Sequence, residues 1–294
     1  MYKIFSGRFS LELLRKKIMC KKGFHPIFID QKLDGLARIS SNQFIFRIDP
    51  VLRRANELAY EPEKLSIGPY HHGKNKLQDM ENYKLRYLKR LLRRQGESSA
   101  KRYIAALVEL EEKARSYYAE NINLSREDFV GMLLLDGCFI IELLRKWDNP
   151  HEDQRNDDPI FLLLAESWCR DLLLFENQIP LFVLVKLFDM TKIPCSQEKG
   201  LIHLAISHLY PLIAADRPPE SSYNVGPEDE IIHLLSLLYK SWCSSMETRD
   251  QEHGISSSSD PKRSDFHAIT LFQQFKMISR AKKSKRRTLC LWKA

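Results

Sequence analysis

The spacing of apolar residues along this chain of 294 residues predicts a series of helices. From Leu77 to Leu92 they recur every three or four positions, which is the period of one helix face. A second such stretch covers about 100–118. The segment from Ser125 to about Trp147 is apolar on nearly every side and opens with an N-cap and acidic residues. Because a helix that is apolar all round is buried, this segment is predicted to be the central helix of the core.

Further helices are predicted on both sides of a polar break at Glu176–Pro180, and again at 198–210 and 228–243. Residues 43–48 are rich in aromatic and β-branched side chains, and an extended conformation is predicted only for them. The predicted fold class is therefore mainly α, with a single helical domain.

Composition divides the chain into three regions. Residues 1–43 form a basic N-terminal segment, residues 44–245 form the helical domain, and residues 246–294 contain a Ser-rich linker and a basic tail. These boundaries are predictions from the change in apolar content and charge along the chain.

The net charge of +8 is unevenly distributed. Residues 1–102 carry a net charge of +13, residues 103–260 carry −14, and residues 261–294 carry +9. A dedicated nucleic-acid-binding domain is usually basic throughout, so this profile argues against one. We expect the basic helix in the first block and the acidic middle block to neutralise each other in part.

Cysteine usage and hydropathy exclude several classes of protein. Six cysteines, none of them in a Cys-x-x-Cys pair, exclude a disulfide-dense secreted scaffold and argue against a structural zinc site. No apolar run reaches about 18 residues without a charged or amide side chain, so no transmembrane helix is predicted. The first 40 residues also lack the continuous apolar stretch of a secretory signal peptide. We therefore expect an intracellular protein.

Three motifs stand out in order along the chain: SIGPYHHG at 66–73, MLLLDGCFI at 132–140 and DLLLFENQIP at 171–180. With them the chain resembles the plant family called domain of unknown function 247. Looser matches at Phe46–Pro50 and His233–Leu235 extend the resemblance to roughly 44–239. The third motif has Phe175 where the family usually has Leu. The resemblance implies a plant protein of largely unknown biochemistry, with no established catalytic residues. Some grass members are linked to pollen–stigma self-incompatibility.

The C-terminal part departs from the family pattern. Members usually continue into another conserved half and end with a membrane-spanning helix. A Ser-rich stretch and a basic tail follow the third motif here. From this difference we expect a truncated paralogue or an incomplete gene model, and the resemblance itself implies membrane association.

The first motif supplies the candidate binding residues Gly68, Pro69, Tyr70, His71 and His72. Adjacent histidine side chains diverge in most backbone conformations, and no His-x-x-x-His pair supports a metal site. We predict that these histidines hydrogen-bond to the backbone, and the alternative is a recognition surface. No metal or other cofactor is predicted, because no P-loop, nucleophile-elbow or His-Glu-x-x-His motif occurs.

The second and third motifs supply polar residues within apolar surroundings. Asp136 lies inside the most apolar helix, where a carboxylate needs a partner. We predict a structural ion pair with Lys84 or with an arginine of the same basic helix, and Gly137 predicts the close approach of another helix. Side chains of the third motif (Glu176, Asn177, Gln178) are predicted to satisfy the backbone at helix ends rather than to act in catalysis.

The tail carries six basic residues within eight positions, namely Arg280, Lys282, Lys283, Lys285, Arg286 and Arg287. This cluster is typical of a nuclear localisation signal or of a segment that binds RNA or anionic lipid, and a solvated tail is the alternative. Trp292 shortly after it favours an anionic membrane surface.

These observations predict a non-enzymatic protein-interaction or signalling module whose partner is another protein. A small-molecule substrate is not expected. One alternative is an unrecognised enzyme that uses the loop with His71 and His72 together with Asp136 or Glu176. Another alternative is a nuclear or nucleic-acid-associated protein that acts through its basic tail.

Overall fold

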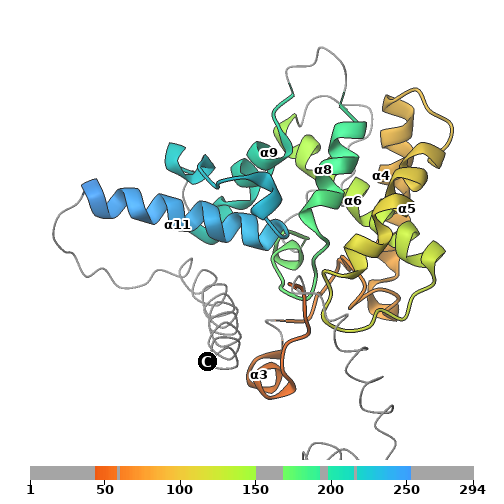
Figure 1. The fold of residues 1–294 in the computed structure, drawn as a ribbon, viewed down its shortest axis with the longest axis horizontal. Coiled ribbons are helices and arrows are strands. Elements are labelled where there is room, and N and C mark those ends of the chain that lie inside the picture. The colour runs from red at the N-terminus through yellow and green to blue at the C-terminus, as the bar shows by residue number, and fades with distance from the viewer. Residues whose placement is uncertain (1–43, 58–59, 150–167, 193–197, 215–216, 253–294) are drawn as a thin grey trace, which may run out of the picture. The chain divides into compact units, whose positions relative to one another are not determined.

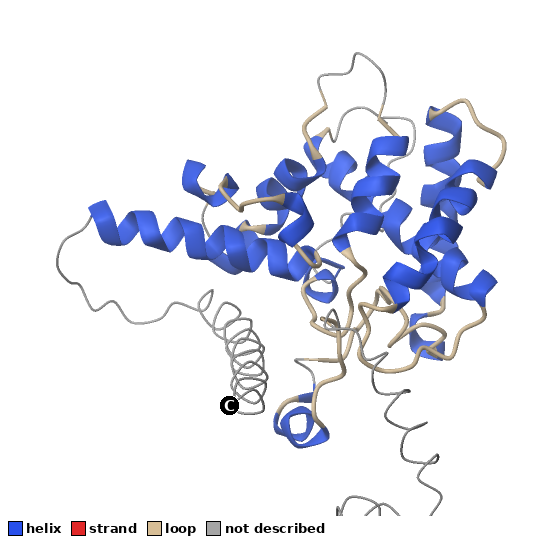
Figure 2. Cartoon of the chain, viewed as in Figure 1, coloured by secondary structure: helices blue, strands red, loops and turns tan. Residues whose placement is uncertain are grey.

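The computed structural model describes residues 44–57, 60–149, 168–192, 198–214 and 217–252. These residues form helices and loops without a strand, as Figure 2 shows, and the mainly α prediction is confirmed. They all belong to the unit of the chain that begins at Phe44. None of the described helices is long and apolar enough to cross a membrane.

The central helix of this unit is α6 (Arg126–Asp148), as the sequence predicts. Its N-cap is Ser125, whose hydroxyl oxygen accepts a hydrogen bond of 3.0 Å from the backbone N–H of Asp128. Acidic residues in the first turn suit the positive end of the helix dipole. Fourteen residues of α6 are buried, because other helices pack around it.

Within the described part of the chain, four helices pack against α6: α4 (Asp79–Arg94), α5 (Lys101–Arg115), α8 (Leu181–Met190) and α9 (Leu201–Leu209) (Figure 1). The contact with α8 is close at Gly137, where a Cβ atom would lie 2.5 Å from Cδ1 of Leu187. The predicted close approach of another helix to Gly137 is therefore confirmed.

Helix α4 follows a short 3₁₀ turn, η2 (Asn75–Leu77), and buries one stripe of side chains against α6. It ends where the chain reaches Gly96, which has a φ of +69°. The N–H of Glu97 bonds to the carbonyl of Leu92, and the N–H of Gly96 bonds to that of Arg93. This is a Schellman motif, in which a residue with positive φ satisfies the last carbonyls of the helix.

The remaining elements are short except for the last. They are α3 (Pro50–Ala55), α10 (Pro211–Ala214), η3 (Glu220–Tyr223), η4 (Glu228–Glu230) and α11 (Leu234–Glu252). Helix α11 packs against η3 and α9, and it continues past residue 245, where the helical domain was predicted to end.

The predicted helix at 228–243 is wrong in its first part, because α11 begins only at Leu234. The reason is a reciprocal cap. The ring nitrogen Nδ1 of His233 accepts from the N–H of Ser236, and the hydroxyl oxygen of Ser236 accepts from the N–H of His233. This arrangement has the geometry of a capping box and sets the start of the helix.

The predicted extended segment forms only an isolated bridge, between Ile45 and Tyr118. The N–H groups of Phe44 and Ile45 donate to the carbonyl of Tyr117, and the N–H of Ala119 donates to that of Ile45. Since the partner segment is the short turn after α5, no longer ladder forms. Ile45 itself is fully buried, so this pairing holds the start of the described chain on the core.

Candidate functional site

The three sequence motifs meet at Gly68. Its N–H donates to Oδ2 of Asp136 over 2.8 Å, which joins the first motif to the second. Its φ is +73°, and a Cβ atom there would collide with the carbonyl oxygen of Gln178 in the third motif. Only glycine fits this position, because both the backbone conformation and the space exclude a side chain.

Next to Gly68 lies the buried ion pair between Lys84 and Asp136. Lys84 Nζ is 2.6 Å from Oδ1 of Asp136, and both side chains are almost completely buried. The ammonium also donates to Glu81 Oε1 and to the carbonyl of Ser66, each at 2.6 Å. Burial alone would lower the pKa of Lys84, but the charges of Asp136 and Glu81 raise it. The predicted pairing of Asp136 with Lys84 is confirmed.

Asn177 and Gln178 are buried and bind backbone groups. The Gln178 amide donates to the carbonyls of Leu172 and Leu174, at the end of a helical turn, and its Oε1 accepts from the N–H of Leu235 in α11. The predicted capping role is therefore confirmed for Gln178. It is confirmed for Asn177 as well, because its Nδ2 donates to the carbonyl of Asp171 in the last helical turn. In addition, Asn177 Oδ1 accepts from the N–H of Ile67, 110 residues earlier in the chain.

Asp171 has a similar role that sequence reasoning did not assign to it. It is fully buried, and its carboxylate accepts hydrogen bonds from the consecutive N–H groups of Glu63, Lys64 and Leu65. Burial raises the pKa of Asp171, and these hydrogen bonds oppose that rise. The only signal in the sequence was its place at the start of the third motif.

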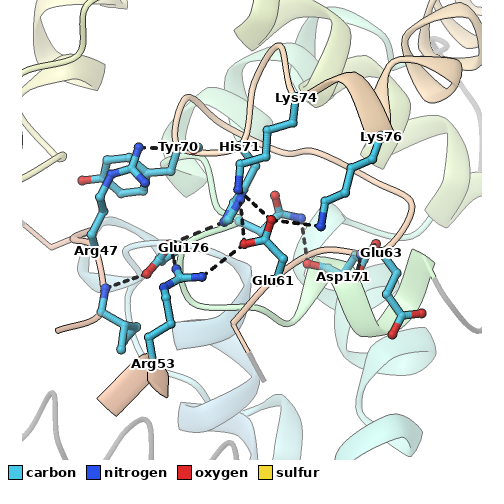
Figure 3. A network of polar contacts seen from close by, with 12 residues as sticks. Arg47, Arg53, Glu61, Glu63, Tyr70, His71, Lys74, Lys76, Asp171 and Glu176 are labelled. Carbon is cyan, nitrogen blue, oxygen red and sulfur yellow. Dashed lines mark hydrogen bonds and ion pairs between the residues drawn. The ribbon is translucent and has the colours of Figure 1, made fainter. Parts of the chain in front are cut away.

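The most polar part of the site is a ring of four side chains, shown in Figure 3. The carboxylates of Glu61 and Glu176 are both contacted by Arg53 and both face His71. Arg53 Nη1 lies 3.1 Å from Glu61 Oε2, and Nη2 bonds to Glu176 Oε2. His71 Nε2 lies 3.5 Å from Glu176 Oε2, and Nδ1 lies 3.8 Å from Glu61 Oε2.

This ring corrects the prediction for the first motif, because the nitrogens of His71 face carboxylates rather than backbone groups. The imidazole is fully buried, and neither of its nitrogens has a hydrogen-bond partner on the backbone. His72 is half-buried and forms no ion pair within the ring. Among the described residues no group of His, Cys, Asp and Glu is arranged to hold a metal ion.

Both carboxylates of the ring are held ionised. Burial alone would raise the pKa of Glu176, but the nearby His71 imidazole and the hydrogen bonds from the N–H of Ile48 and from Arg53 bring it below its usual value. Burial has the same effect on Glu61, where Lys74 and Lys76 outweigh it and lower the pKa to about 2. The ring therefore contains two stable negative charges.

A cleft of about 930 Å³ lies beside the ring. Its lining carries both signs of charge, with basic side chains from Arg47, Arg53, Lys74 and Lys76 and acidic ones from Asp49, Glu57, Glu61, Glu120 and Glu176. Next to it, α3 exposes two large apolar side chains, Val51 at 65% and Leu52 at 39%. Leu52 also lines the cleft.

Tyr70 connects the first motif to the far wall of the cleft. Its hydroxyl bonds to the carboxylate of Glu120 and lies 3.0 Å from the carbonyl of Ile45. The Arg47 guanidinium lies over the Tyr70 ring, 4.7 Å from its centre. Burial and the neighbouring Glu120 raise the pKa of the Tyr70 hydroxyl, which keeps it protonated. Pro69 beside it is half-buried.

Comparison with protein-family models matches residues 45–291 to DUF247, whose description is plant protein of unknown function. The chain belongs to this family. The resemblance noted from the three motifs is thereby confirmed, and the matched range includes residues that the composition assigned to a linker and tail. The tail cluster from Arg280 to Arg287 lies outside the described residues.

Two Arabidopsis thaliana relatives share the family. The chain is 37% identical over 162 residues to the UPF0481 protein At3g47200, and this aligned region covers 54% of the chain and 33% of that relative. It is 30% identical over 145 residues to the putative UPF0481 protein At3g02645, covering 49% of this chain and 27% of that protein. The matched part thus spans about a third of these relatives. No solved structure matches the chain.

Proposed function

We propose that this DUF247 chain is a non-enzymatic module that binds another protein through α3 and the adjacent cleft. The observation that carries the proposal is the exposure of Val51 and Leu52 on a short helix at the edge of a cleft lined by both signs of charge. Large apolar side chains that are exposed within a polar rim are typical of protein-binding surfaces.

The hydrogen bonds that the buried motif side chains make within the protein support a non-enzymatic role. Asp136, Asn177 and Gln178 are buried, and each bonds to backbone groups or to a buried cation. A general acid or base must be within hydrogen-bond reach of a substrate. These side chains already use their polar atoms to hold the three motifs together, which supports a structural role for them.

Proximity labelling in plant tissue tests the proposal with two matched variants. The double variant Val51→Asp/Leu52→Asp places charge on α3, and Leu85→Asp places it on α4, where Leu85 is 51% exposed. We expect the double variant to reduce labelling of the wild-type partners by about tenfold, because buried apolar contacts dominate binding energy. Leu85→Asp is expected to keep the partners. Equal labelling by the wild type and the double variant would refute the proposal.

The contact between His71 and Glu176 favours a second candidate, an enzyme that uses this pair. Its weakness is that the imidazole is fully buried and both of its nitrogens face carboxylates. Turnover of a small molecule by the purified chain, lost in Glu176→Gln, would establish the enzyme and overturn the binding proposal.

A further inference from the structure

Two lysines at the rim of the cleft form a close pair of cations. Lys74 is the N-cap of η2, and Lys76 lies within η2. Their ammonium groups lie 2.6 Å and 3.0 Å from one and the same oxygen, Oε1 of Glu61 (Figure 3). Because a single carboxylate oxygen reaches both ammonium groups, one further carboxylate can also contact both.

The charges around this pair are sorted by depth. The side chains of Lys74 and Lys76 are 36% and 50% exposed, whereas those of Glu61 and Glu176 are 18% and 0% exposed. A group that enters the cleft from solvent therefore meets the ammonium groups first, and the carboxylates lie behind them.

The two lysines also keep hydrogen-bonding capacity. An ammonium group has three N–H donors, and within the described part of the chain Glu61 is the only ion-pair partner of Lys74 and Lys76. Glu61 binds Arg53 as well, and Arg53 in turn binds Glu176. Three cations thus share two carboxylates, and the excess positive charge lies on the exposed lysines. Burial alone would raise the pKa of Glu61, but the two lysines lower it to about 2, which agrees with a positive potential at this place.

The acidic side chains on the rest of the lining are mostly engaged with the protein itself. Both oxygens of Glu120 accept hydrogen bonds, one from the N–H of Arg47 and one from the Tyr70 hydroxyl. Asp49 is the N-cap of α3 and accepts from a backbone N–H of that helix. Glu57 is the exception, because it lines the cleft, is exposed and forms no ion pair with a described residue. Its charge therefore provides a test of the sign of a bound partner.

We propose that the segment of the partner protein bound by this cleft is acidic: an aspartate or glutamate binds Lys74 and Lys76, and a neighbouring large apolar side chain packs on Leu52. This inference rests on the proposed function and names the chemistry of the partner at that site. Leu52 and both lysines line the same cleft of about 930 Å³, so one short segment contacts all three. The complementary charge selects among partners, because a basic segment would bring like charges together at the rim.

A library of random peptides displayed on phage and selected on the immobilised full chain tests the inference. We expect the enriched sequences to carry an aspartate or glutamate beside a large apolar residue. An enriched peptide is then synthesised and its affinity is measured by fluorescence anisotropy, together with that of a version in which amides replace the carboxylates. This comparison of peptides requires no change in the protein.

The double variant Lys74→Gln/Lys76→Gln supplies the protein side of the test. We expect it to weaken binding of the acidic peptide by about three- to tenfold, the size of two exposed ion pairs, and to leave binding of the amide version unchanged. The matched control is Lys89→Gln/Arg93→Gln, which removes two exposed cations from α4 and is expected to have no effect. Glu57→Gln is expected to strengthen binding of the acidic peptide, because it removes a negative charge from the cleft.

Several outcomes would overturn the inference. They are a library that enriches no acidic sequences on the wild type, equal binding of the acidic peptide and its amide version, and undiminished binding of the acidic peptide by Lys74→Gln/Lys76→Gln. Weaker binding by Glu57→Gln would also overturn it, since a cationic partner would cause that loss.

These outcomes are separate from those that decide the proposed function. If Val51→Asp/Leu52→Asp loses the partners in plant tissue while Lys74→Gln/Lys76→Gln keeps its affinity for the acidic peptide, the binding surface stands and the acidic segment fails. If the α3 variant keeps the partners while the lysine variant loses affinity for the acidic peptide, the lysine site stands and the proposed function fails.

Discussion

Replacing Asp136 by asparagine tests the most buried charge pair of this family member. The carboxylate of Asp136 is 1% exposed, accepts from Lys84 Nζ and from the N–H of Gly68, and has no access to water. In Asp136→Asn the side chain keeps its shape but loses its charge. Lys84 then remains buried with one carboxylate, that of Glu81, instead of two.

The magnitude follows from what the substitution leaves behind. Removal of one partner from a buried ion pair costs about 3–5 kcal/mol, because the remaining charge stays out of water. Glu81 and the carbonyl of Ser66 still bind the ammonium of Lys84, so we expect a loss near the lower end, about 3 kcal/mol. That is a large part of the roughly 5–15 kcal/mol by which a domain is stable.

Urea unfolding followed by tryptophan fluorescence measures this loss, since Trp168 is fully buried. Glu81→Gln is the matched control. The side chain of Glu81 is 19% exposed, so its pairing with Lys84 contributes about 1 kcal/mol or less. A free energy of unfolding for Asp136→Asn within about 0.5 kcal/mol of the wild type would refute the reasoning. A double-mutant cycle with Lys84→Met should give a coupling energy of more than about 1 kcal/mol.

Three further predictions concern the packing and charge of the site. Gly68→Ala should lose more than about 2 kcal/mol in urea unfolding, whereas Gly73→Ala, with a similar φ but open space, should lose about 1 kcal/mol; equal losses would contradict the proposed collision with Gln178. Gly137→Ala should lower the thermal midpoint because Leu187 must move, and Gly131→Ala, with nothing within 4 Å, should raise it. Glu61 has a folded pKa of about 2 against an ordinary value of 4.5, so its stabilisation is complete above pH 4.5 and is lost as the pH falls toward 2. Acid titration of stability should therefore be shallower in Glu61→Gln, and an identical slope would contradict the assignment.

The long helices and the buried pair could be predicted because each leaves a regular pattern in the sequence. Lys84 falls on the apolar stripe of α4 and Asp136 falls within the apolar α6, so each charge had to find a partner inside the core. The N-cap at Ser125 has its own local signature. In each case the pattern that carries the prediction lies within one or two helical turns of sequence, although the two partners of the buried pair are 52 residues apart.

The ring around His71 could not be predicted in the same way. Arg53 lies in a helix of six residues and Glu61 in a loop, so neither belongs to a periodic pattern. The partner that Arg53 has in the third motif, Glu176, is more than 100 residues away, and the contact depends on how that motif folds back. The prediction of where α11 begins was wrong for a different reason. His233 is an unusual cap, and the acidic residues before it resemble those of a first helical turn.

The meeting of three motifs at Gly68 has a consequence for the chain while it is being synthesised. The buried N–H of Ile67 in the first motif has its acceptor on Asn177, so the first motif cannot complete its hydrogen bonds before the third motif is in place. The N–H of Ile48, before the first motif, likewise has its acceptor on Glu176. Helices α4, α5 and α6 can form earlier from local sequence, and Lys84 and Asp136 can then bind Ser66 and Gly68. The loop at 66–73 nevertheless lacks its partners from the third motif until residue 178 has left the ribosome. This order makes the docking of the third motif a late, non-local step of folding. A nascent chain stopped before that point should be sensitive to proteases at this loop.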